Sequence, residues 1–390
     1  MTRPGEPAGT RGVGHLWRWV RDPVGLLEDG ARTGPVFRLR LWRPVLVGYL
    51  PEWNRAVLRD LATFRSRGSL SGLTPYLAGG VVHTDVPAHT ARRRELDPHF
   101  HARAVAPLAD RLRAAARAAQ PTGGFEAVSW AGVVVRRMLN AAFFGGRLPD
   151  GLLGEFLAPL DGRLPGPLVP RPMRFGRFDR ALRRVLCDPP PGSLAAALAT
   201  MDNAVEETRI ALAAGYDTTA HTLAWAVWHL AGAPQRRNVE TLPLVIDEIL
   251  RLYPAGWIGS RVTSRDTVAA GVEIPAGTMV LYSPYLTNRD PLLWPEPAEF
   301  RPERFVDGRP AWGYIPFSAG RRTCLGSQLA RLMLRAAVEP FSEADLVQVS
   351  GDPSVRAGIT LCPAGPLWLE RRPARHITTA GSAPGGGASR

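Results

Sequence analysis

The residue best suited to do chemistry in this sequence is Cys324, within the segment FSAGRRTCLG at 317–326. The chain has only three cysteines, Cys187, Cys324 and Cys362, too few for a disulfide framework, so a special cysteine would act as a thiol or a metal ligand. A cysteine at the start of a helix gains free backbone N–H groups and the positive end of the helix dipole, and both favour the thiolate. We predict such a helix from near Cys324 to about Val338, and we interpret Cys187 and Cys362 as small buried hydrophobic residues.

The segment around Cys324 resembles the haem-binding loop of the cytochrome P-450 family. That loop has Phe, two residues, Gly, one residue, Arg or His, one residue, Cys, one residue and Gly, positions filled here by Phe317, Gly320, Arg322, Cys324 and Gly326. The resemblance implies that the Cys324 thiolate binds the iron of haem b and favours cleavage of the O–O bond of bound oxygen. It also implies that Phe317 shields the iron–sulfur bond from water, that Arg322 pairs with a haem propionate, and that Gly320 permits the turn that aims backbone amides at the sulfur.

The segment AGYDTT at 214–219 resembles the oxygen-activation signature of the same family. Gly and Thr are poor helix formers, so a helix that is merely buried has little use for them together. The resemblance implies that Ala214 and Gly215 lie beside the haem, where one widened helical turn makes room for dioxygen and water. It makes Asp217 and Thr218 the predicted catalytic pair, which relays protons. The alternative is a Gly-bearing packing contact with a solvated Asp and Thr.

Three basic residues are predicted to contact the haem propionates. In DVPAHTARRR at 85–94, His89 and Arg93 are four residues apart and therefore share one helical face. Arg261 stands at the start of a predicted strand. The resemblance implies the propionate contacts, and the alternative is that these residues are solvated surface.

The segments EILR at 248–251 and FRPERF at 300–305 resemble two further motifs of the family. The resemblance implies that Glu248, Arg251 and Arg304 form a buried charge network behind the cysteine loop. We assign this network to folding and haem retention, because breaking it would leave an uncompensated buried charge. Taken alone, Glu and Arg three residues apart are more often an exposed helix pair.

Hydrophobic patterning predicts a mainly α fold with a small β part. The predicted elements are a strand pair at 36–49, a short helix from Pro51, mostly helix over 88–235 with a long helix at about 202–230, a helix at about 241–253, short strands over 257–283, an ordered coil over 284–316, and the helix after Cys324. The resemblance covers about residues 30–370 and implies one triangular haem domain at 15–375. A mobile N-terminus (1–14) and a disordered tail (376–390) are expected on either side.

The composition excludes several classes of protein. All 48 basic residues are Arg, against 35 acids, which gives a net charge of +13. These arginines are scattered and no reader motif appears, which argues against a nucleic-acid binder. No apolar run approaches the roughly 18 residues of a membrane span, and the N-terminus lacks the apolar core of a signal peptide. We therefore expect a cytoplasmic, monomeric protein without a membrane segment.

The resemblance implies a haem-thiolate monooxygenase that uses O2 to oxidise a small organic, natural-product-like substrate, with hydroxylation as the expected reaction. Oxidative C–C, C–O or C–N coupling, for example in a small aromatic peptide, stays open, as does a haem-binding sensor without catalysis. No flavin or nucleotide motif is present, so NAD(P)H would act indirectly, through a ferredoxin or flavodoxin with its reductase. We expect Arg321, Arg92 to Arg94, Arg331 and Arg335 to steer an acidic partner.

Overall fold

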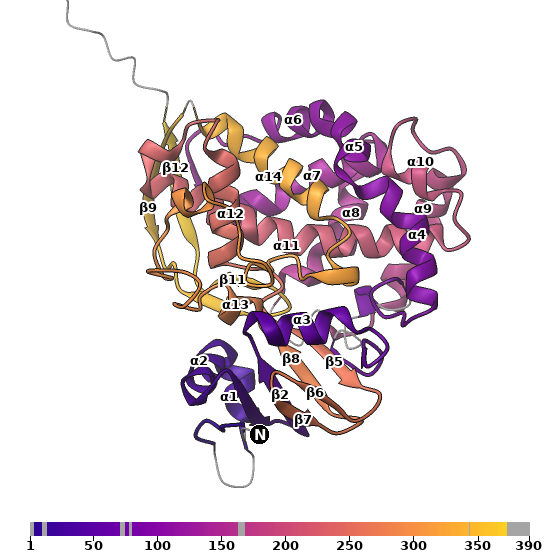
Figure 1. Cartoon of the computed structure of the whole chain (residues 1–390). Coiled ribbons are helices and arrows are strands. Elements are labelled where there is room, and N and C mark those ends of the chain that lie inside the picture. Colours follow the sequence, from indigo (N-terminus) through magenta and orange to yellow (C-terminus); the bar gives the residue numbers. More distant parts are fainter. Residues whose placement is uncertain are drawn as a thin grey trace, which may run out of the picture.

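The computed structural model describes residues 4–9, 14–70, 75–77, 80–162, 168–342 and 344–372. Figure 1 shows a larger helical part above a smaller part that holds most of the strands and the first three helices. This arrangement agrees with the prediction of a mainly α fold with a small β part.

The helix α11 (Ala204–Gly232) crosses the centre of the helical part (Figure 1). Apolar residues such as Leu212, Leu223 and Trp225 lie on several sides of it and are fully buried, as expected for a helix with neighbours all around. Its most extensive contact is with α7 (Ala127–Phe144), whose first turn is capped by the Glu126 carboxylate. The helix α14 (Ser327–Val338) also packs against α11, and this contact brings the segment around Cys324 to the central helix.

The remaining helices surround this centre or cover the β-rich part. They are α1 (Leu16–Arg21), α2 (Pro23–Thr33), α3 (Pro51–Arg59), α4 (Ala88–Phe100), α5 (Ala102–Val105), α6 (Ala109–Arg117), α8 (Asp150–Leu157), α9 (Pro172–Cys187), α10 (Leu194–Leu198), α12 (Leu242–Leu252) and α13 (Pro284–Thr287). Short 3₁₀ turns include η4 (Ala158–Asp161), η6 (Pro234–Arg236), η7 (Pro302–Phe305) and η8 (Gly320–Arg322).

The principal sheet has five strands in the order β1-β2-β8-β5-β3. The strand β2 pairs antiparallel with β1 and parallel with β8, with Val45 opposite Met279, so the sheet joins chain segments more than two hundred residues apart. Its strands are β1 (Val36–Arg40), β2 (Pro44–Gly48), β3 (Phe64–Arg65), β5 (Gly259–Thr263) and β8 (Met279–Tyr282). Three smaller sheets contain β4 (Gly124–Glu126), β6 (Thr267–Ala269), β7 (Val272–Ile274), β9 (Asp345–Gly351), β10 (Val355–Ala357), β11 (Leu361–Pro363) and β12 (Leu367–Arg372).

Most predicted elements are confirmed, and three details differ. The last long helix begins at Ser327, so Cys324 lies in the turn before it. The helix α11 is a regular α-helix throughout, so the expected widened turn is absent. The strands β9 to β12 were not predicted, because β12 pairs with the distant β4 and the exposed positions of β9 lack a clear alternation, although β10 and β11 pair locally.

The two expected flexible ends are only partly described. Within the N-terminal segment, Gly5 forms a bridge with Phe37 of β1, and His15 contacts the Pro7 carbonyl at 2.9 Å. The tail at 376–390 lies outside the described residues. In the part of the chain that the structure describes, none of the helices combines the length and the apolar character needed to cross a bilayer.

Candidate functional site

The loop that carries Cys324 is a closed turn held by its own backbone. The N–H of Cys324 donates to the Phe317 carbonyl at 2.9 Å, and the N–H of Thr323 donates to the Gly320 carbonyl at 3.1 Å. Gly320 has φ +70°, and a Cβ there would meet the Leu58 carbonyl oxygen of α3 at 2.7 Å. Only glycine fits this position, as the sequence predicted.

Cys324 is an exposed residue whose thiol is nevertheless surrounded by protein atoms. Its surface is exposed, yet burial among protein atoms raises the pKa of the thiol, opposed by the N–H of Gly326 and the positive charge of Arg93. A Cβ on Gly326 would meet no atom within 4 Å. The loop therefore presents a sulfur and an open space beside it.

Three guanidinium groups, those of Arg93, Arg261 and Arg322, and the imidazole of His89 gather near the same loop. Burial, followed by the positive charges of Arg322, Arg93 and Arg261, lowers the pKa of His89 to about 4. Burial, with the charges of Arg261 and Arg93, lowers the pKa of Arg322 to about 10. The charge of Asp85 opposes both of these shifts, and Asp97 pairs with Arg93 at 2.7 Å.

Several polar atoms of these side chains are buried and lack a partner. They are Nδ1 of His89 and Nε of Arg261 and Arg322, whereas Nε of Arg93 lies 2.7 Å from Oδ1 of Asp97. A buried donor without an acceptor is costly, so such a cluster calls for an anionic ligand. A haem supplies two carboxylates and an iron that takes a thiolate, and these residues fit that group in both respects. Arg322 also donates to the carbonyls of Val82 and Thr84, which anchor it beside α4.

One face of α11 is open in an otherwise buried helix. Ala214 is exposed and Thr218 is half-buried, although both lie in the middle of the central helix. The Thr218 hydroxyl donates to the Ala214 carbonyl at 2.6 Å, so its oxygen keeps lone pairs for another donor. The open face of α11 therefore carries a hydroxyl that can accept and relay a proton.

Two predicted residues of this segment lie elsewhere than expected. Gly215 is half-buried, and a Cβ there would lie 3.4 Å from Cδ2 of Leu139 of α7, an ordinary contact distance, so the packing of α7 does not itself require glycine here. Asp217 is 5 % exposed and turns to Thr360, whose hydroxyl donates to Oδ2 of Asp217 at 2.7 Å. The alternative of a solvated Asp217 is therefore wrong.

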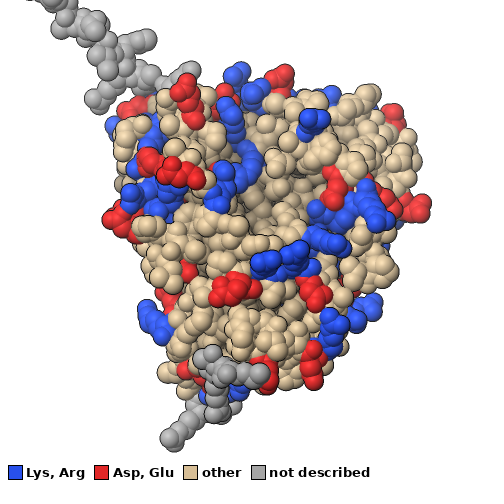
Figure 2. Space-filling model, in the orientation of Figure 1, with Lys and Arg blue, Asp and Glu red and all other residues tan. Residues whose placement is uncertain are grey.

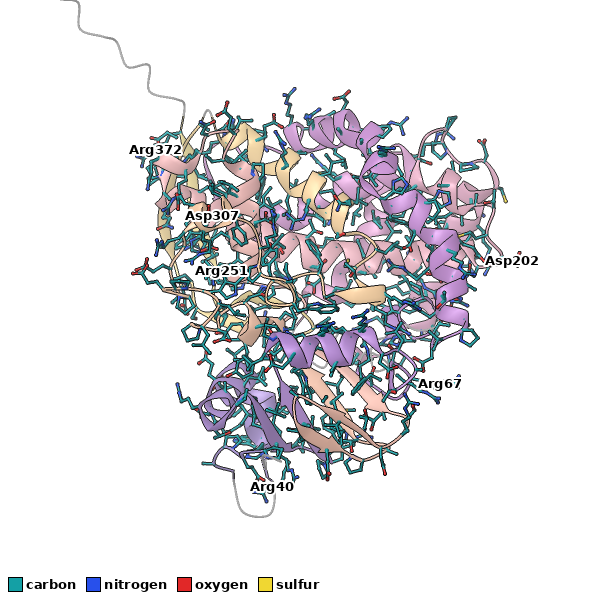
Figure 3. All side chains as sticks on the ribbon, in the orientation of Figure 1. Arg40, Arg67, Asp202, Arg251, Asp307 and Arg372 are labelled. Atoms are coloured by element: carbon teal, nitrogen blue, oxygen red, sulfur yellow. The ribbon has the colours of Figure 1, made fainter. Side chains whose placement is uncertain are left out.

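The predicted charge network is present and fully buried. The Arg251 guanidinium makes two hydrogen bonds to the Glu248 carboxylate, at 2.7 and 2.9 Å, and Nε of Arg304 reaches Oε1 of Glu248 at 3.1 Å. Arg251 also donates to the carbonyls of Asn288 and Pro297, both at 2.8 Å, and Figure 3 shows it in the interior beside the coil. The network thus ties α12 to the coil that precedes the cysteine loop.

A second anchor on α12 was missed at the level of sequence. Asp247 is 1 % exposed and accepts from the Tyr314 hydroxyl at 2.9 Å, while Arg331 of α14 reaches it at 2.5 Å and Arg309 also contacts it. The guanidinium of Arg331 lies 5.3 Å from the centre of the Phe317 ring. Asp247 stands beside the motif residue Glu248, but nothing in its local pattern names these distant partners.

The structure divides the predicted basic patch. Arg92 lies 3.1 Å from Glu207 of α11, Arg93 donates to the Thr323 carbonyl at 2.9 Å, and Arg331 contacts Asp247, so these three side chains serve internal contacts. Arg94 and Arg321 instead line a surface hollow of about 620 Å³. Arg335 is exposed on α14.

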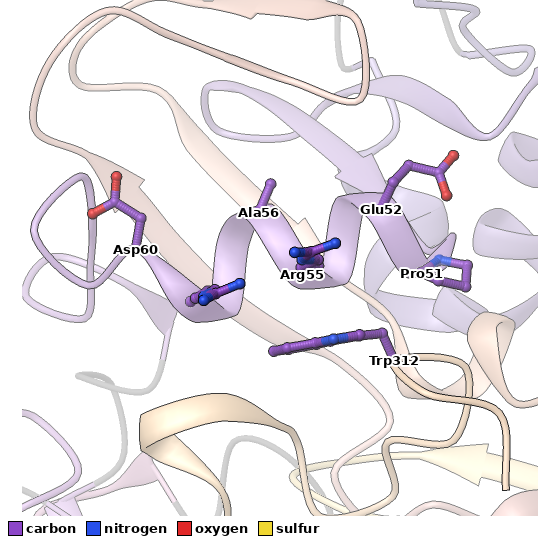
Figure 4. Close-up of a pocket in the computed structure, with 7 residues that line it drawn as sticks. Pro51, Glu52, Arg55, Ala56, Asp60 and Trp312 are labelled. Atoms are coloured by element: carbon purple, nitrogen blue, oxygen red, sulfur yellow. The ribbon is translucent and has the colours of Figure 1, made fainter.

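A neighbouring hollow extends this surface along α3. It has a volume of about 740 Å³, and Figure 4 shows Arg55 above the Trp312 ring. The two hollows share Arg59 and Asp60. Figure 2 shows basic side chains gathered over the region of α3 and α4 on this face.

The remaining cysteines contribute nothing to this site. Cys362 is buried, as predicted, whereas Cys187 at the end of α9 is exposed, so its predicted burial is wrong. Phe178 and Leu182 form the buried face of α9, and Cys187 at its end is exposed to solvent.

Comparisons with known proteins agree with the geometry. The family model "Cytochrome P450" matches residues 233–341. Two proteins of Streptomyces melanosporofaciens, cyclooctatin synthase and cyclooctat-9-en-7-ol 5-monooxygenase, are each 27 % identical; the alignments cover 82 % of this chain and 84 % and 83 % of those proteins. The crystal structure of CYP175A1 from Thermus thermophillus superposes with a TM-score of 0.80 at 26 % identity, over 94 % of this chain and all of that one.

Proposed function

The chain belongs to the cytochrome P450 family and is an oxidoreductase, and from this premise we propose that it hydroxylates a small organic, natural-product-like substrate. The observation that carries the proposal is the pairing of the Cys324 loop with a cluster of Arg93, Arg261, Arg322 and His89, in which buried nitrogen atoms of His89, Arg261 and Arg322 lack a partner although Asp85 and Asp97 lie beside the cluster. Proteins of this family use haem iron and O2 and receive electrons from a partner protein. In the proposal the haem is haem b, and the electrons come from NAD(P)H through a ferredoxin or flavodoxin.

Cys324 would hold the haem iron, while His89, Arg93, Arg261 and Arg322 would hold its propionates. When bound, the haem iron activates O2 for insertion of one oxygen atom into the substrate. The turn through Gly320 and the N–H of Gly326 orient the sulfur, and the N–H favours its thiolate form. Nδ1 of His89, which is buried and has no partner within the protein, would donate a hydrogen bond to a propionate.

Asp217 and Thr218 would deliver protons at the open face of α11. The Thr218 hydroxyl accepts one hydrogen bond while it donates another, which lets it pass a proton toward an oxygen in the hollow. Asp217 lies on the buried side of the same helical turn and would return a proton to the Thr218 hydroxyl. This pair favours catalysis over a sensor, because a protein that only binds a ligand has no use for a proton relay.

The substrate class rests on the relatives. One of them is named for a 5-monooxygenation of cyclooctat-9-en-7-ol, which supports hydroxylation of a largely apolar natural product here. Oxidative coupling would use the same residues and is the second candidate reaction carried over from the sequence.

The electron donor would dock over the groove between α3, α4 and η8. Arg55, Arg59, Arg94 and Arg321 line its two hollows, against Glu52 and Asp60, so an acidic protein is the complementary partner. The groove borders the cysteine loop, because Gly320 packs against Leu58 of α3. Electrons would therefore enter on the side of the sulfur.

The test of the function is the spectrum of the reduced, CO-treated protein. We expect the long-wavelength Soret band of thiolate ligation, and we expect Cys324→His and Cys324→Ser to abolish it. Cys187→Ser and Cys362→Ser are matched controls and should leave the band unchanged. A wild-type spectrum in either Cys324 variant would refute the assignment of the iron ligand.

A further inference from the structure

Asp217, Thr360 and His221 form a closed cluster between α11 and the turn that joins β10 to β11. The Thr360 hydroxyl lies 2.7 Å from Oδ2 of Asp217 and 2.9 Å from Nδ1 of His221. Nδ1 of His221 also lies 3.2 Å from Oδ1 of Asp217. The three residues are 5 %, 4 % and 9 % exposed, so water competes little with these contacts.

The hydrogen-bonding capacities of these groups allow two arrangements of one proton. With Asp217 ionised, the carboxylate only accepts, so Thr360 donates to it and the Thr360 oxygen accepts from N–H at Nδ1 of His221. In the second arrangement Asp217 is protonated and donates to Thr360, and Thr360 donates to the bare Nδ1. Moving from the first to the second takes the proton from Nδ1 to the Thr360 oxygen while the Thr360 proton passes to Asp217. An imidazolium–carboxylate pair thereby becomes a neutral imidazole and a carboxylic acid, and no other atom changes.

The electrostatics bring the two arrangements close in energy. Burial raises the pKa of Asp217, and burial lowers the pKa of His221, so the two groups approach each other in proton affinity. Their mutual attraction opposes both shifts.

Charged groups on the surrounding elements act on the same pair. Arg356 of β10 lowers the pKa of both groups, and Glu126, which caps α7, raises that of His221. Asp161 of η4 lies near enough for the Asp217 carboxylate to raise its pKa, and Tyr216 donates to Asp161 at 3.1 Å. Arg356 therefore favours the carboxylate of Asp217, whereas Glu126 favours the imidazolium of His221.

We propose that His221 and Thr360 are positioning residues for Asp217: they hold its carboxyl and return a proton to it after it has supplied Thr218. This inference rests on the proposed function. Ala214, Thr218 and His221 follow one another at intervals of four and three residues and share one face of α11, so the cluster borders the open face. The side chain of His221 is 11 % exposed, and in this proposal the ring takes up protons from water there.

The first experiment measures the titration of His221 by imidazole ¹⁵N NMR in the diamagnetic CO-bound ferrous protein. Thr360→Val removes the hydroxyl at nearly constant volume. Asp217 then loses a hydrogen bond that favours its charged form and supports the imidazolium less, so the pKa of His221 should fall by about one unit. Thr360→Ser keeps the hydroxyl and should restore the wild-type titration. Identical titrations in the wild type and Thr360→Val would overturn the inference.

The second experiment measures NADPH consumption and peroxide release without substrate, using a surrogate ferredoxin and reductase, across pH and in D2O. Thr360→Val and His221→Phe should slow consumption roughly tenfold, within the range of lost proton-transfer assistance, and should raise the solvent isotope effect. Thr360→Ser should recover the wild-type pH profile. A pH profile and isotope effect in Thr360→Val that match the wild type would show that the cluster serves packing alone.

The matched control is a half-buried histidine–hydroxyl pair whose histidine lies on the same helix. Nε2 of His229 lies 2.9 Å from the Tyr253 hydroxyl, with no carboxylate in contact among the described residues. Tyr253→Phe should leave the pH profile and isotope effect unchanged, and a change as large as that of Thr360→Val would refute a specific role for the Asp217 cluster. A normal Soret band in the wild type, together with the same His221 titration in the wild type and Thr360→Val, would overturn this inference alone. A missing band in the wild type would overturn the proposed function.

Discussion

At the residue scale, Thr218 offers the sharpest test of proton delivery. Its hydroxyl points along the open face of α11, bonded to Ala214, so Thr218→Ala removes a donor and acceptor without disturbing the core. We expect the variant to keep the haem but to divert most electrons into hydrogen peroxide, measured as peroxide and product per NAD(P)H consumed.

Asp217→Asn should behave differently from Thr218→Ala. It keeps the hydroxyl of Thr218 but removes the carboxyl that resupplies it, so turnover should fall by roughly tenfold or more with less uncoupling. Wild-type rates and coupling in both variants would mean that the pair is only helix packing.

At the element scale, α12 is attached to the coil before the cysteine loop by Glu248. Because this carboxylate is fully buried against Arg251 and Arg304, Glu248→Gln leaves two guanidinium groups without their counter-charge. We expect a loss of about 3–5 kcal/mol in the free energy of unfolding, together with loss of haem on purification. Denaturant unfolding and haem content per chain measure the two effects, and Glu303→Gln, at an exposed pair with Arg236, is the control that should change neither by much.

The packing of α11 on α12 also sets a dependence of stability on pH. Burial lowers the pKa of His229 to about 4, below the 6.5 of an unfolded chain. As the pH falls, the unfolded chain therefore binds a proton at His229 before the folded protein does. The free energy of unfolding, which is highest above pH 6.5, decreases as the pH falls toward 4, by at most about 3 kcal/mol for this group. Urea unfolding between pH 7 and 5 should show a smaller loss in His229→Gln than in the wild type; equal losses would contradict the assignment.

At the scale of the whole molecule, the groove over α3, α4 and η8 predicts a salt-dependent encounter. Reduction by an acidic ferredoxin should slow as ionic strength rises, because charge attraction is screened over about 10 Å at 0.1 M salt. The double variant Arg59→Glu and Arg321→Glu should be reduced more slowly at low salt, and its reduction rate should depend less on ionic strength. Arg117→Glu, on α6 at the other end of the helical part, should leave the reduction rate unaltered, and a rate indifferent to salt in the wild type would exclude electrostatic steering.

The sequence by itself determined the parts of the site that are local in the chain. The loop around Cys324 closes through hydrogen bonds between residues at most seven apart, and Gly320 is required by its own backbone conformation. The course of α11 and the pairing of Glu248 with Arg251 follow from helical spacing. Such features depend on neighbours along the chain, so motif and periodicity were sufficient to predict them.

Only the tertiary structure decided which distant groups complete these motifs. Thr360 reaches Asp217 across 143 residues, and Asp247 meets Tyr314 and Arg331 from other segments. It also decided that Arg92 and Arg331 contact buried carboxylates while Arg94 and Arg321 line a surface groove. The sequence shows that each arginine is charged, but the direction of each side chain depends on how α4, α11, α12 and α14 pack. The packing of these helices positions buried carboxylates, and these carboxylates determine which guanidinium groups turn inward.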